Sequence, residues 1–144
     1  MTLDVVVTSV SSDAHTWNLV YLQLLLEELG CQVTNLGGCT LDETVVAECA
    51  ARNPDLIVVS SLNGHGGKDG IRLIGAIRSC GALAATPVVI GGKLDVTGGD
   101  GGRTTARLLA AGFDAVFGET GWQTEFRSLV QALAVGTGVP TRAR

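Results

Sequence analysis

The chain has 144 residues, of which 46% are hydrophobic and 17% charged, a composition typical of one globular domain with a full hydrophobic core. Its net charge of −4 and the lack of a basic stripe argue against nucleic acid as a partner. Aromatic residues make up only 4%, so the core must consist mainly of aliphatic side chains.

The cysteines and the hydropathy pattern bear on where the protein works. Four cysteines, Cys31, Cys39, Cys49 and Cys80, form no Cys-x-x-Cys pair, which argues against a zinc site or a redox dithiol. The first residues lack the basic segment of a signal peptide, and no apolar run reaches the ~18 residues of a membrane span. We therefore expect a cytoplasmic protein with no membrane partner.

The first predicted strand covers residues 4–8, and a helix with leucines at helical spacing follows over residues 17–29. Thr16 is the predicted N-cap of this helix, and Gly30 is its predicted C′ residue. A second strand is predicted over residues 32–36, where Val33 and Leu36 supply apolar side chains.

The second predicted helix, residues 41–52, begins with the pattern of a capping box, in which Thr40 would be the N-cap and Glu43 the N3 residue. Asn53-Pro54 should end it, because a residue before proline disfavours the helical region. The later predicted elements are a strand over 56–60, a glycine-rich loop over 61–67, a helix over 69–80, a strand over 88–90 closed by a turn at 91–93, a helix over 103–111, a strand over 115–117, a loop over 118–121 and a helix over 122–135.

Strictly alternating strands and helices predict a parallel sheet with helices on both faces. We expect an α/β, flavodoxin-like (Rossmann-like), doubly wound sheet of five strands in the order 2-1-3-4-5, formed by residues 1–136, with 137–144 as a flexible tail. Ligands of such sheets bind where the strand order reverses, here between the first and third strands. The loops 9–15 and 60–67 and the turn at Gly91-Gly92 should therefore converge.

These three segments carry a recognisable pattern. Asp13-Ala14-His15, Ser60-Ser61-Leu62 and Gly91-Gly92 together resemble the D-x-H-x-x-G, S-x-L and G-G motifs of cobalamin-binding domains. Each motif alone is weak, but all three follow their expected strands in order, and the resemblance covers nearly the whole chain. Within this family, Ser12-Asp13-Ala14-His15 and Ser60-Ser61-Leu62-Asn63-Gly64 are most similar to the small subunits of glutamate mutase (methylaspartate mutase).

The resemblance implies a role for each motif. His15 would ligate the cobalt of the corrin and displace the cofactor's own dimethylbenzimidazole, while Asp13 would accept the other imidazole N–H. The displaced nucleotide tail would enter a cleft between the first and third strands. There Ser60 would hydrogen-bond a ring nitrogen of the base, and Leu62 would pack near the corrin.

Glycines would complete this site. Gly91 and Gly92 would let the backbone approach the nucleotide tail, since a Cβ atom there would clash. The loop containing Gly118 and Gly121 could close over the same tail. The expected cofactor-binding residues are Ser12, Asp13, Ala14, His15, Thr16, Ser60, Leu62, Asn63, Gly64, Gly91, Gly92, Lys93, Gly118, Thr120 and Gly121, with His15 as the metal ligand.

Three positions depart from the family pattern. Asn18 stands where a glycine is expected three residues after the histidine, which affects how the first helix packs against the tail. Asn63 and His65 replace the tyrosine and glutamine usual in the glutamate mutase small subunit. These changes suggest a diverged relative with an altered corrin-facing surface or partner contact.

Simpler interpretations of the same residues remain open. Asp13 and His15 could be loop residues that lead into a helix, with Asp13 stabilising its positive end. Ser60 could satisfy a backbone group at a strand end, and a glycine pair is usually a turn. A response-regulator receiver domain would share the fold but needs a phosphorylatable aspartate after the third strand, where this chain has serines.

The resemblance implies an isomerase subunit that binds adenosylcobalamin (cobalt) and is inactive alone. It would hold the cofactor against a large TIM-barrel mutase subunit, which would bind the amino-acid substrate and interconvert L-glutamate and L-threo-3-methylaspartate by a radical mechanism. The arginines are predicted on helices or in the tail, away from the strand-end loops, so a site for a dicarboxylate is not apparent here. No catalytic residue is predicted in this chain.

Two further functions are alternatives. The first is a corrinoid carrier for methyl transfer, which usually adds an N-terminal helical cap over the corrin, whereas this sequence starts directly at its first strand. The second is a stand-alone cobalamin-binding module, which is normally fused to an output domain. The upper ligand that the protein prefers and the genes beside its own would distinguish them.

Overall fold

Five parallel strands form one sheet in the order β2-β1-β3-β4-β5, as predicted. The computed structural model describes residues 2–62, 64–94 and 102–136. Its strands are β1 (Asp4–Ser9), β2 (Gln32–Asn35), β3 (Leu56–Ser61), β4 (Val88–Gly92) and β5 (Ala115–Phe117). Its helices are α1 (Thr16–Glu28), α2 (Asp42–Arg52), α3 (Gly66–Ser79), α4 (Arg103–Ala111) and α5 (Gln123–Ala134), with a short 3₁₀ helix, η1 (Gly81–Leu83).

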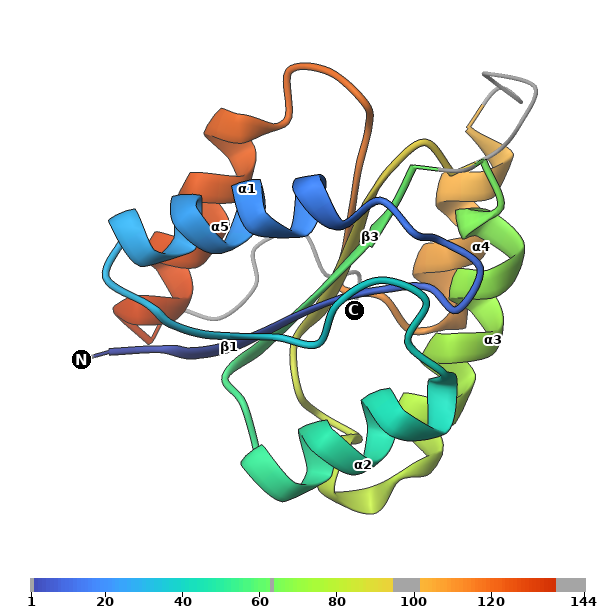
Figure 1. Cartoon of the computed structure of the whole chain (residues 1–144), viewed down its shortest axis with the longest axis horizontal. Coiled ribbons are helices and arrows are strands. Elements are labelled where there is room, and N and C mark those ends of the chain that lie inside the picture. Colours follow the sequence, from blue (N-terminus) through green and yellow to red (C-terminus); the bar gives the residue numbers. More distant parts are fainter. Residues whose placement is uncertain (1, 63, 95–101, 137–144) are drawn as a thin grey trace.

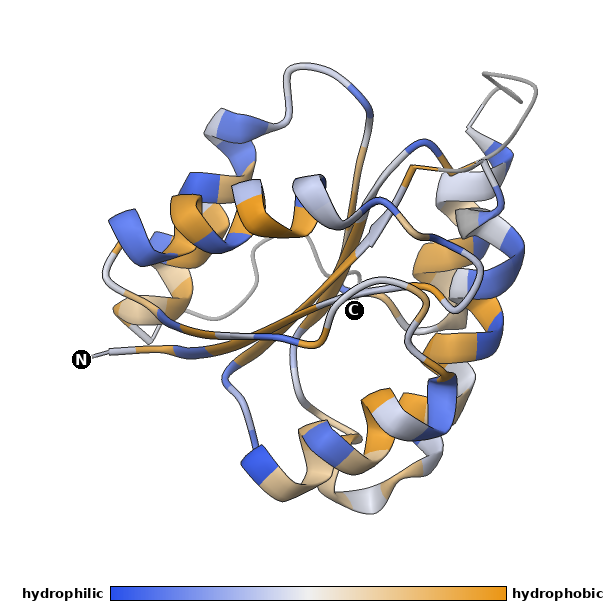
Figure 2. Ribbon diagram, viewed as in Figure 1, coloured by the Kyte–Doolittle hydropathy of each residue, from blue (hydrophilic) through white to orange (hydrophobic). Residues whose placement is uncertain are grey.

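Helices cover both faces of the sheet, with α1 and α5 on one side and α2, α3 and α4 on the other (Figure 1). Neighbouring strand residues face opposite layers, because side chains alternate along a strand. Val5 and Val7 belong to the core beneath α1 and α5, whereas Val6 belongs to the core beneath the other three helices. The middle of each of β1, β3 and β4 is therefore apolar, while polar residues lie on the outer helix faces (Figure 2).

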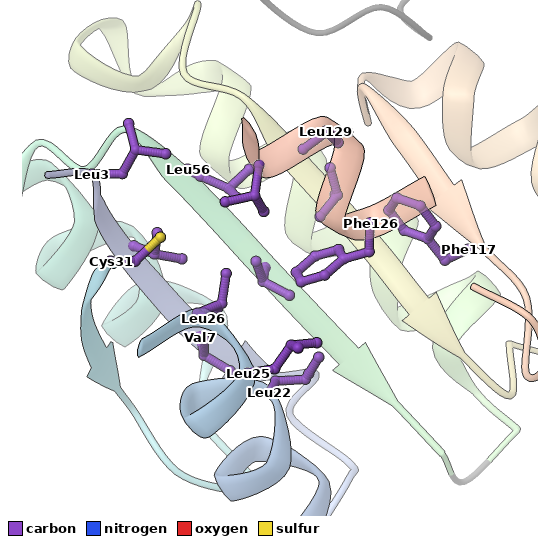
Figure 3. Packing of buried hydrophobic residues seen from close by; sticks show 14 of the residues in the cluster. Leu3, Val7, Leu22, Leu25, Leu26, Cys31, Leu56, Phe117, Phe126 and Leu129 are labelled. Atoms are coloured by element: carbon purple, nitrogen blue, oxygen red, sulfur yellow. The ribbon is translucent and has the colours of Figure 1, made fainter. Parts of the chain in front are cut away.

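The core between the sheet and helices α1 and α5 supplies part of the wall of the candidate site described below. Leu22, Leu25 and Leu26 of α1 pack there with Phe117 and Phe126, as Figure 3 shows. Phe117 and Phe126 meet edge to face, with ring centroids 5.6 Å apart. Phe117, Phe126 and the partly buried Trp122 are the aromatic members of this core, and most of the rest are aliphatic.

The strand register places the three sequence motifs side by side. Ser9, at the end of β1, pairs with Ser60 of β3. Ser60 and Ser61 then pair with Gly91 and Gly92 of β4. The predicted convergence of these segments at the carboxyl edge of the sheet is therefore confirmed.

The end of α1 is also as predicted. Gly30 has a φ of +90°, and its N–H donates to the Glu27 carbonyl, while the Cys31 N–H donates to the Leu26 carbonyl. These two hydrogen bonds form a Schellman motif, which glycine favours because its left-handed conformation carries no Cβ penalty.

Two predicted helix starts were wrong by one residue. Thr16 is the first residue of α1, and His15 occupies the N-cap without a capping side-chain bond. Leu41, not Thr40, is the N-cap of α2. The Thr40 hydroxyl instead donates to the Leu36 and Gly37 carbonyls, which lie in the loop before the helix. Loop carbonyls therefore compete successfully for the side chain that the capping box would use.

Two glycine segments are more regular than predicted. Gly91 and Gly92 are the last residues of β4 rather than a turn after it, because both pair with β3. Helix α3 begins at Gly66, inside the segment predicted as a loop. Within the described ranges, no helix combines the length and apolar character that crossing a membrane would require.

Candidate functional site

The loop between β1 and α1 is held in place through the backbone of Asp13. Its carbonyl accepts hydrogen bonds from the Cys39 N–H at 2.7 Å and the Ser9 hydroxyl at 3.2 Å. Its N–H donates to the Val10 carbonyl at 3.1 Å. Gly38 packs so closely that a Cβ atom there would lie 3.2 Å from the same carbonyl. The loop after β2 thus braces the loop that carries His15.

The Asp13 carboxylate joins His15 to the end of β3. Oδ1 lies 2.6 Å from His15 Nδ1 and accepts the His15 backbone N–H at 2.8 Å. Oδ2 accepts the backbone N–H of Leu62. Asp13 is only 1% exposed, whereas the His15 side chain is 55% exposed. The carboxylate is therefore buried, while the imidazole that it holds faces outward.

The protonation of this pair follows from its contacts. Burial alone would raise the pKa of Asp13, but hydrogen bonds from Leu62 and His15 outweigh burial and hold that pKa below its ordinary value. An ionised Asp13 accepts a proton on Nδ1, and in the neutral imidazole this tautomer leaves the lone pair on Nε2. This arrangement of carboxylate, imidazole and free nitrogen is the one by which proteins orient a metal-ligating histidine.

A cavity lies beside this pair, under α1 and α5. It holds about 90 Å³, or about 500 Å³ of empty space when its open mouth is included. Five of the predicted cofactor-binding residues line it: Ser60, Leu62, Gly91, Gly92 and Gly118. Its described lining comes from α1, β3, β4, β5, α5 and the segments after β3 and β5, and no β1 residue is among it. The cavity thus lies over β3 to β5, and the entry of a nucleotide tail between the first and third strands stays a prediction.

Sequence reasoning missed several residues of the cavity. Leu22, Phe117, Glu119, Trp122 and Phe126 all line it. Trp122 meets Phe126 edge to face at 5.6 Å and Tyr21 at 6.1 Å. The concentration of so few aromatic residues near the last strand and helix was the available signal in the sequence.

Asn18, which was read only as a missing glycine, also lines the cavity. Its Nδ2 donates to the Ser60 hydroxyl at 2.6 Å. Asn18 and Leu22 are four residues apart, so they share one face of α1. That spacing could have shown that Asn18 points toward the sheet.

The glycine pair is required by the sheet itself. Gly92 has a φ of +113°, and a Cβ atom on it would lie 2.1 Å from the Ser61 carbonyl oxygen. A Cβ atom on Gly91 would lie 3.2 Å from the Cβ of Phe117. Close packing against β3 and β5 therefore explains both glycines, and the approach of a nucleotide tail stays a prediction.

The remaining predicted residues are more dispersed. Ala14 and Thr16 are exposed beside His15, and Thr120 and Gly121 are exposed in the loop after β5 without lining the cavity. Gly64 is buried, and its N–H donates to the Lys93 carbonyl at 3.2 Å. Asn63 lies outside the described residues. His65, at the N-cap of α3, is exposed.

Ser12 belongs to a charged cluster that ties the His15 loop to α2 and α3. Its hydroxyl donates to Asp69, and Arg72 contacts Asp69 at 3.0 Å and Asp42 at 2.6 Å. Arg72 also donates to the Ser11 hydroxyl at 2.8 Å. The prediction that the arginines lie away from the strand-end loops is thus wrong for Arg72, whose long side chain reaches back from α3.

The charges in this cluster stabilise one another. Burial would raise the pKa of Asp69, but hydrogen bonds from Ser12 and Arg72 hold it below its ordinary value. The hydrogen bond to Asp42 is the main reason that the pKa of Arg72 is raised. Arg72 is therefore engaged by two carboxylates of its own chain.

Comparison with known proteins assigns the family. A family model described as the B12 binding domain matches residues 3–122. The glutamate mutase sigma subunit of Halobacterium salinarum is 34% identical over 139 residues, which cover 96% of this chain and 90% of that relative. By their names, these relatives are sigma subunits of glutamate mutase.

Solved structures show the fold. A cobalamin-binding protein from Desulfitobacterium hafniense superposes with a TM-score of 0.70 at 19% identity, covering 91% of this chain and 58% of that chain. A response regulator from Aurantimonas sp. SI85-9A1 has the same TM-score at 18% identity, covering 94% of this chain and 87% of its own. The fold is thus common to both classes, and the sequence match decides between them: this chain belongs to the B12-binding domain family.

Proposed function

We propose that this chain is the cobalamin-binding subunit of an adenosylcobalamin-dependent mutase that interconverts L-glutamate and L-threo-3-methylaspartate in the cytoplasm. The observation that carries the proposal is the Asp13–His15 pair, in which a buried carboxylate leaves an exposed imidazole with one free nitrogen. The family match supports the cofactor, and the sigma-subunit relatives support the choice of mutase.

The residues fit a cobalamin bound through histidine. Nε2 of His15 would hold the cobalt, and Asp13 would hold the opposite ring nitrogen and raise the basicity of the ligand. When bound, the cofactor would supply a carbon-centred radical that removes a hydrogen atom from the substrate. The contribution of this chain is to bind and orient the corrin.

The cavity is the proposed site of the displaced nucleotide tail. Ser60 would donate to a ring nitrogen of the base, and Leu62 would pack against the corrin. The open mouth of the cavity supports this role, since a tail must enter from the corrin side. The other residues that we propose to contact the cofactor are Ser12, Ala14, Thr16, Asn63, Gly64, Gly91, Gly92, Lys93, Gly118, Thr120 and Gly121.

A large TIM-barrel subunit would cover the upper face of the corrin and bind the amino acid. Two features support a partner. Arg72 and Arg78 are engaged by carboxylates of this chain, Arg72 by Asp42 and Asp69 and Arg78 by Asp114, rather than offered to a dicarboxylate substrate. Trp17 is 83% exposed only two residues after His15, and large apolar groups of this kind are common at protein interfaces.

Reconstitution tests the proposal. This chain, adenosylcobalamin and a glutamate mutase large subunit should together convert L-glutamate into 3-methylaspartate, whereas each protein alone should give no product. Product from this chain without a partner would refute the division of labour. If the pair converted another substrate instead, the cofactor assignment would stand and the substrate assignment would be refuted. Preferential binding of methylcobalamin with a methyltransferase would favour the carrier function instead.

A further inference from the structure

The hydrogen bond between Asn18 and Ser60 sets the direction of a hydroxyl group inside the cavity. Ser60 is 3% exposed, and its Oγ accepts the Asn18 amide N–H at 2.6 Å. A serine hydroxyl has one hydrogen and two acceptor lone pairs. Because Asn18 occupies a lone pair, the hydroxyl hydrogen must point away from Asn18.

That hydrogen is available to a ligand. Within the described ranges, the bond from Asn18 is the one hydrogen bond that the Ser60 side chain makes. The nearby walls of the cavity are apolar and include Leu22, Val58 and Val89. A hydroxyl donor that a ligand buries against such walls loses free energy unless the ligand supplies an acceptor.

We propose that Asn18 is a positioning residue that holds the Ser60 hydroxyl as a donor and thereby makes the cavity selective for a corrinoid whose lower base carries an acceptor ring nitrogen. This inference rests on the proposed function, because it assumes that the cavity receives the nucleotide tail. It assigns a specific role to a residue that departs from the family motif.

The neighbouring pair, Asp13 and His15, is arranged in the same way as Asn18 and Ser60: one residue orients the hydrogen-bonding group of the other. Asp13 fixes which nitrogen of His15 carries its proton, and Asn18 fixes which way Ser60 donates. Both fixing residues come from the β1–α1 segment, and both also contact the end of β3, Asp13 through the Leu62 N–H. One segment therefore orients the group that would hold the metal and the group that would hold the displaced base.

Absorbance titrations with three corrinoids test the role of Asn18. The probes are cobalamin, a cobamide whose lower base is a phenol-derived ring without nitrogen, and cobinamide, which has no nucleotide. A phenol-derived base does not have to be displaced from cobalt, so the affinities are compared between variant and wild type for each corrinoid. Asn18→Ala should weaken cobalamin binding about three- to tenfold, and so lower the preference for cobalamin over the phenol-derived cobamide relative to its wild-type value, with cobinamide binding unchanged.

Two further variants separate orientation from general packing. Asn18→Asp replaces the amide donor by a carboxylate acceptor, so Ser60 should turn its hydrogen to residue 18, and cobalamin binding should weaken more than in Asn18→Ala. In a Ser60→Ala background, Asn18→Ala should have little further effect, because its contribution acts through Ser60. Gln23→Ala, which removes an amide from the same helix outside the cavity, is the matched control and should change none of the affinities.

The outcomes distinguish the two proposals. If the wild-type protein binds no cobalamin, the proposed function fails. If it binds cobalamin but Asn18→Ala keeps the full preference for the nitrogen-containing base, or the two substitutions are additive, only the role of Asn18 is overturned. Circular dichroism melting curves should show that all variants are folded at the titration temperature, so that lost binding can be assigned to the site.

Discussion

The two sides of the cavity are built differently. On one side, the Asp13 carboxylate accepts the Leu62 N–H and the Asn18 amide donates to the Ser60 hydroxyl, so that both join the β1–α1 segment to the end of β3. On the other side, all four residues of the loop 118–121 are exposed, and in the described structure none of them makes a hydrogen bond outside regular elements. A Cβ atom on Gly118 or Gly121 would meet nothing within 4 Å.

This difference indicates which side is prepared before a ligand arrives. Groups already held in their binding conformation lose little entropy on binding, which strengthens affinity and fixes orientation. For the proposed ligand, the side that carries His15 and Ser60 would have this property, whereas the loop 118–121 has room to adjust. We therefore expect substitutions on the first side to alter binding or folding strongly, and matched substitutions on the second side to be tolerated.

Replacement of His15, the proposed metal ligand, should have the largest effect on cobalamin binding. His15→Gly should weaken binding of cobalamin by more than about 100-fold, since loss of a residue that only supports a metal ligand already costs about 10–100-fold. Electron paramagnetic resonance of the Co(II) form measures the change directly. Labelling the wild-type protein with nitrogen-15 histidine should alter the superhyperfine splitting, and the variant should lose this nitrogen signal.

His65→Ala is the control for the histidine experiment, because His65 is exposed at the start of α3. The splitting should be the same in this variant as in the wild-type protein. A complex that forms with the wild-type protein but shows no isotope effect would exclude histidine ligation and leave the cobalamin assignment to other contacts.

Gly92→Ala should strongly destabilise the protein, because Gly92 packs against β3 on the side of the cavity that carries His15 and Ser60. The new Cβ atom would lie 2.1 Å from the Ser61 carbonyl oxygen at a φ of +113°, and strain plus overpacking should reduce the free energy of unfolding by about 3 kcal/mol. The matched control is Gly118→Ala, whose Cβ atom meets nothing and should change stability by less than about 1 kcal/mol. Urea unfolding measures both. Equal losses would show that the two sides are equally constrained.

Asp13→Ala tests whether Asp13 supports His15 as the metal ligand. The substitution frees His15 Nδ1 and the Leu62 N–H, so cobalamin affinity or turnover should fall about 10–100-fold without unfolding the domain. Titration with cobalamin, together with a melting curve, checks both parts. Wild-type affinity and turnover in this variant would mean that Asp13 serves only the start of α1.

The fold was predictable because its signals are local and repeated. Each strand is a short apolar run between glycine- or proline-containing segments, and strict alternation with helices allows few topologies. The failures have a common physical origin. Thr40 was assigned to the α2 N-terminus, yet its hydroxyl bonds the Leu36 and Gly37 carbonyls, whose positions depend on how β2 and the following loop pack.

The site was predictable only where one motif supplies both partners. Asp13 and His15 are two residues apart, so their contact can be inferred from the sequence. The partners Asn18 and Ser60 are 42 residues apart, and nothing local to either indicates that α1 brings the amide to the hydroxyl. Arg72 was likewise misplaced, because its contact with Ser11 spans 61 residues.

The smallest expected effect is on thermal stability and concerns the charged cluster that joins the His15 loop to α3. Asp69 is buried and contacts Ser12 and Arg72, while Asp42 and His65 are the other ionisable groups near this pair. Its pKa lies below the ordinary value of 3.8 when the protein is folded. A group whose pKa is lowered by folding stabilises the native state above its unfolded pKa, and this stabilisation is lost as the pH falls through the folded pKa.

Asp69→Asn should therefore lower the melting temperature by a few degrees near neutral pH, since a partly exposed ion pair contributes about 0.2–1 kcal/mol. The difference from the wild-type protein should persist down to a pH of about 3.8 and then disappear as the wild-type Asp69 becomes protonated. Glu48→Gln removes an exposed pair with Arg52 on α2 and should change the melting temperature less at every pH. If the Asp69→Asn difference were constant from neutral to acid pH, it would reflect altered packing, and the charge of Asp69 would not be what anchors the His15 loop to α3.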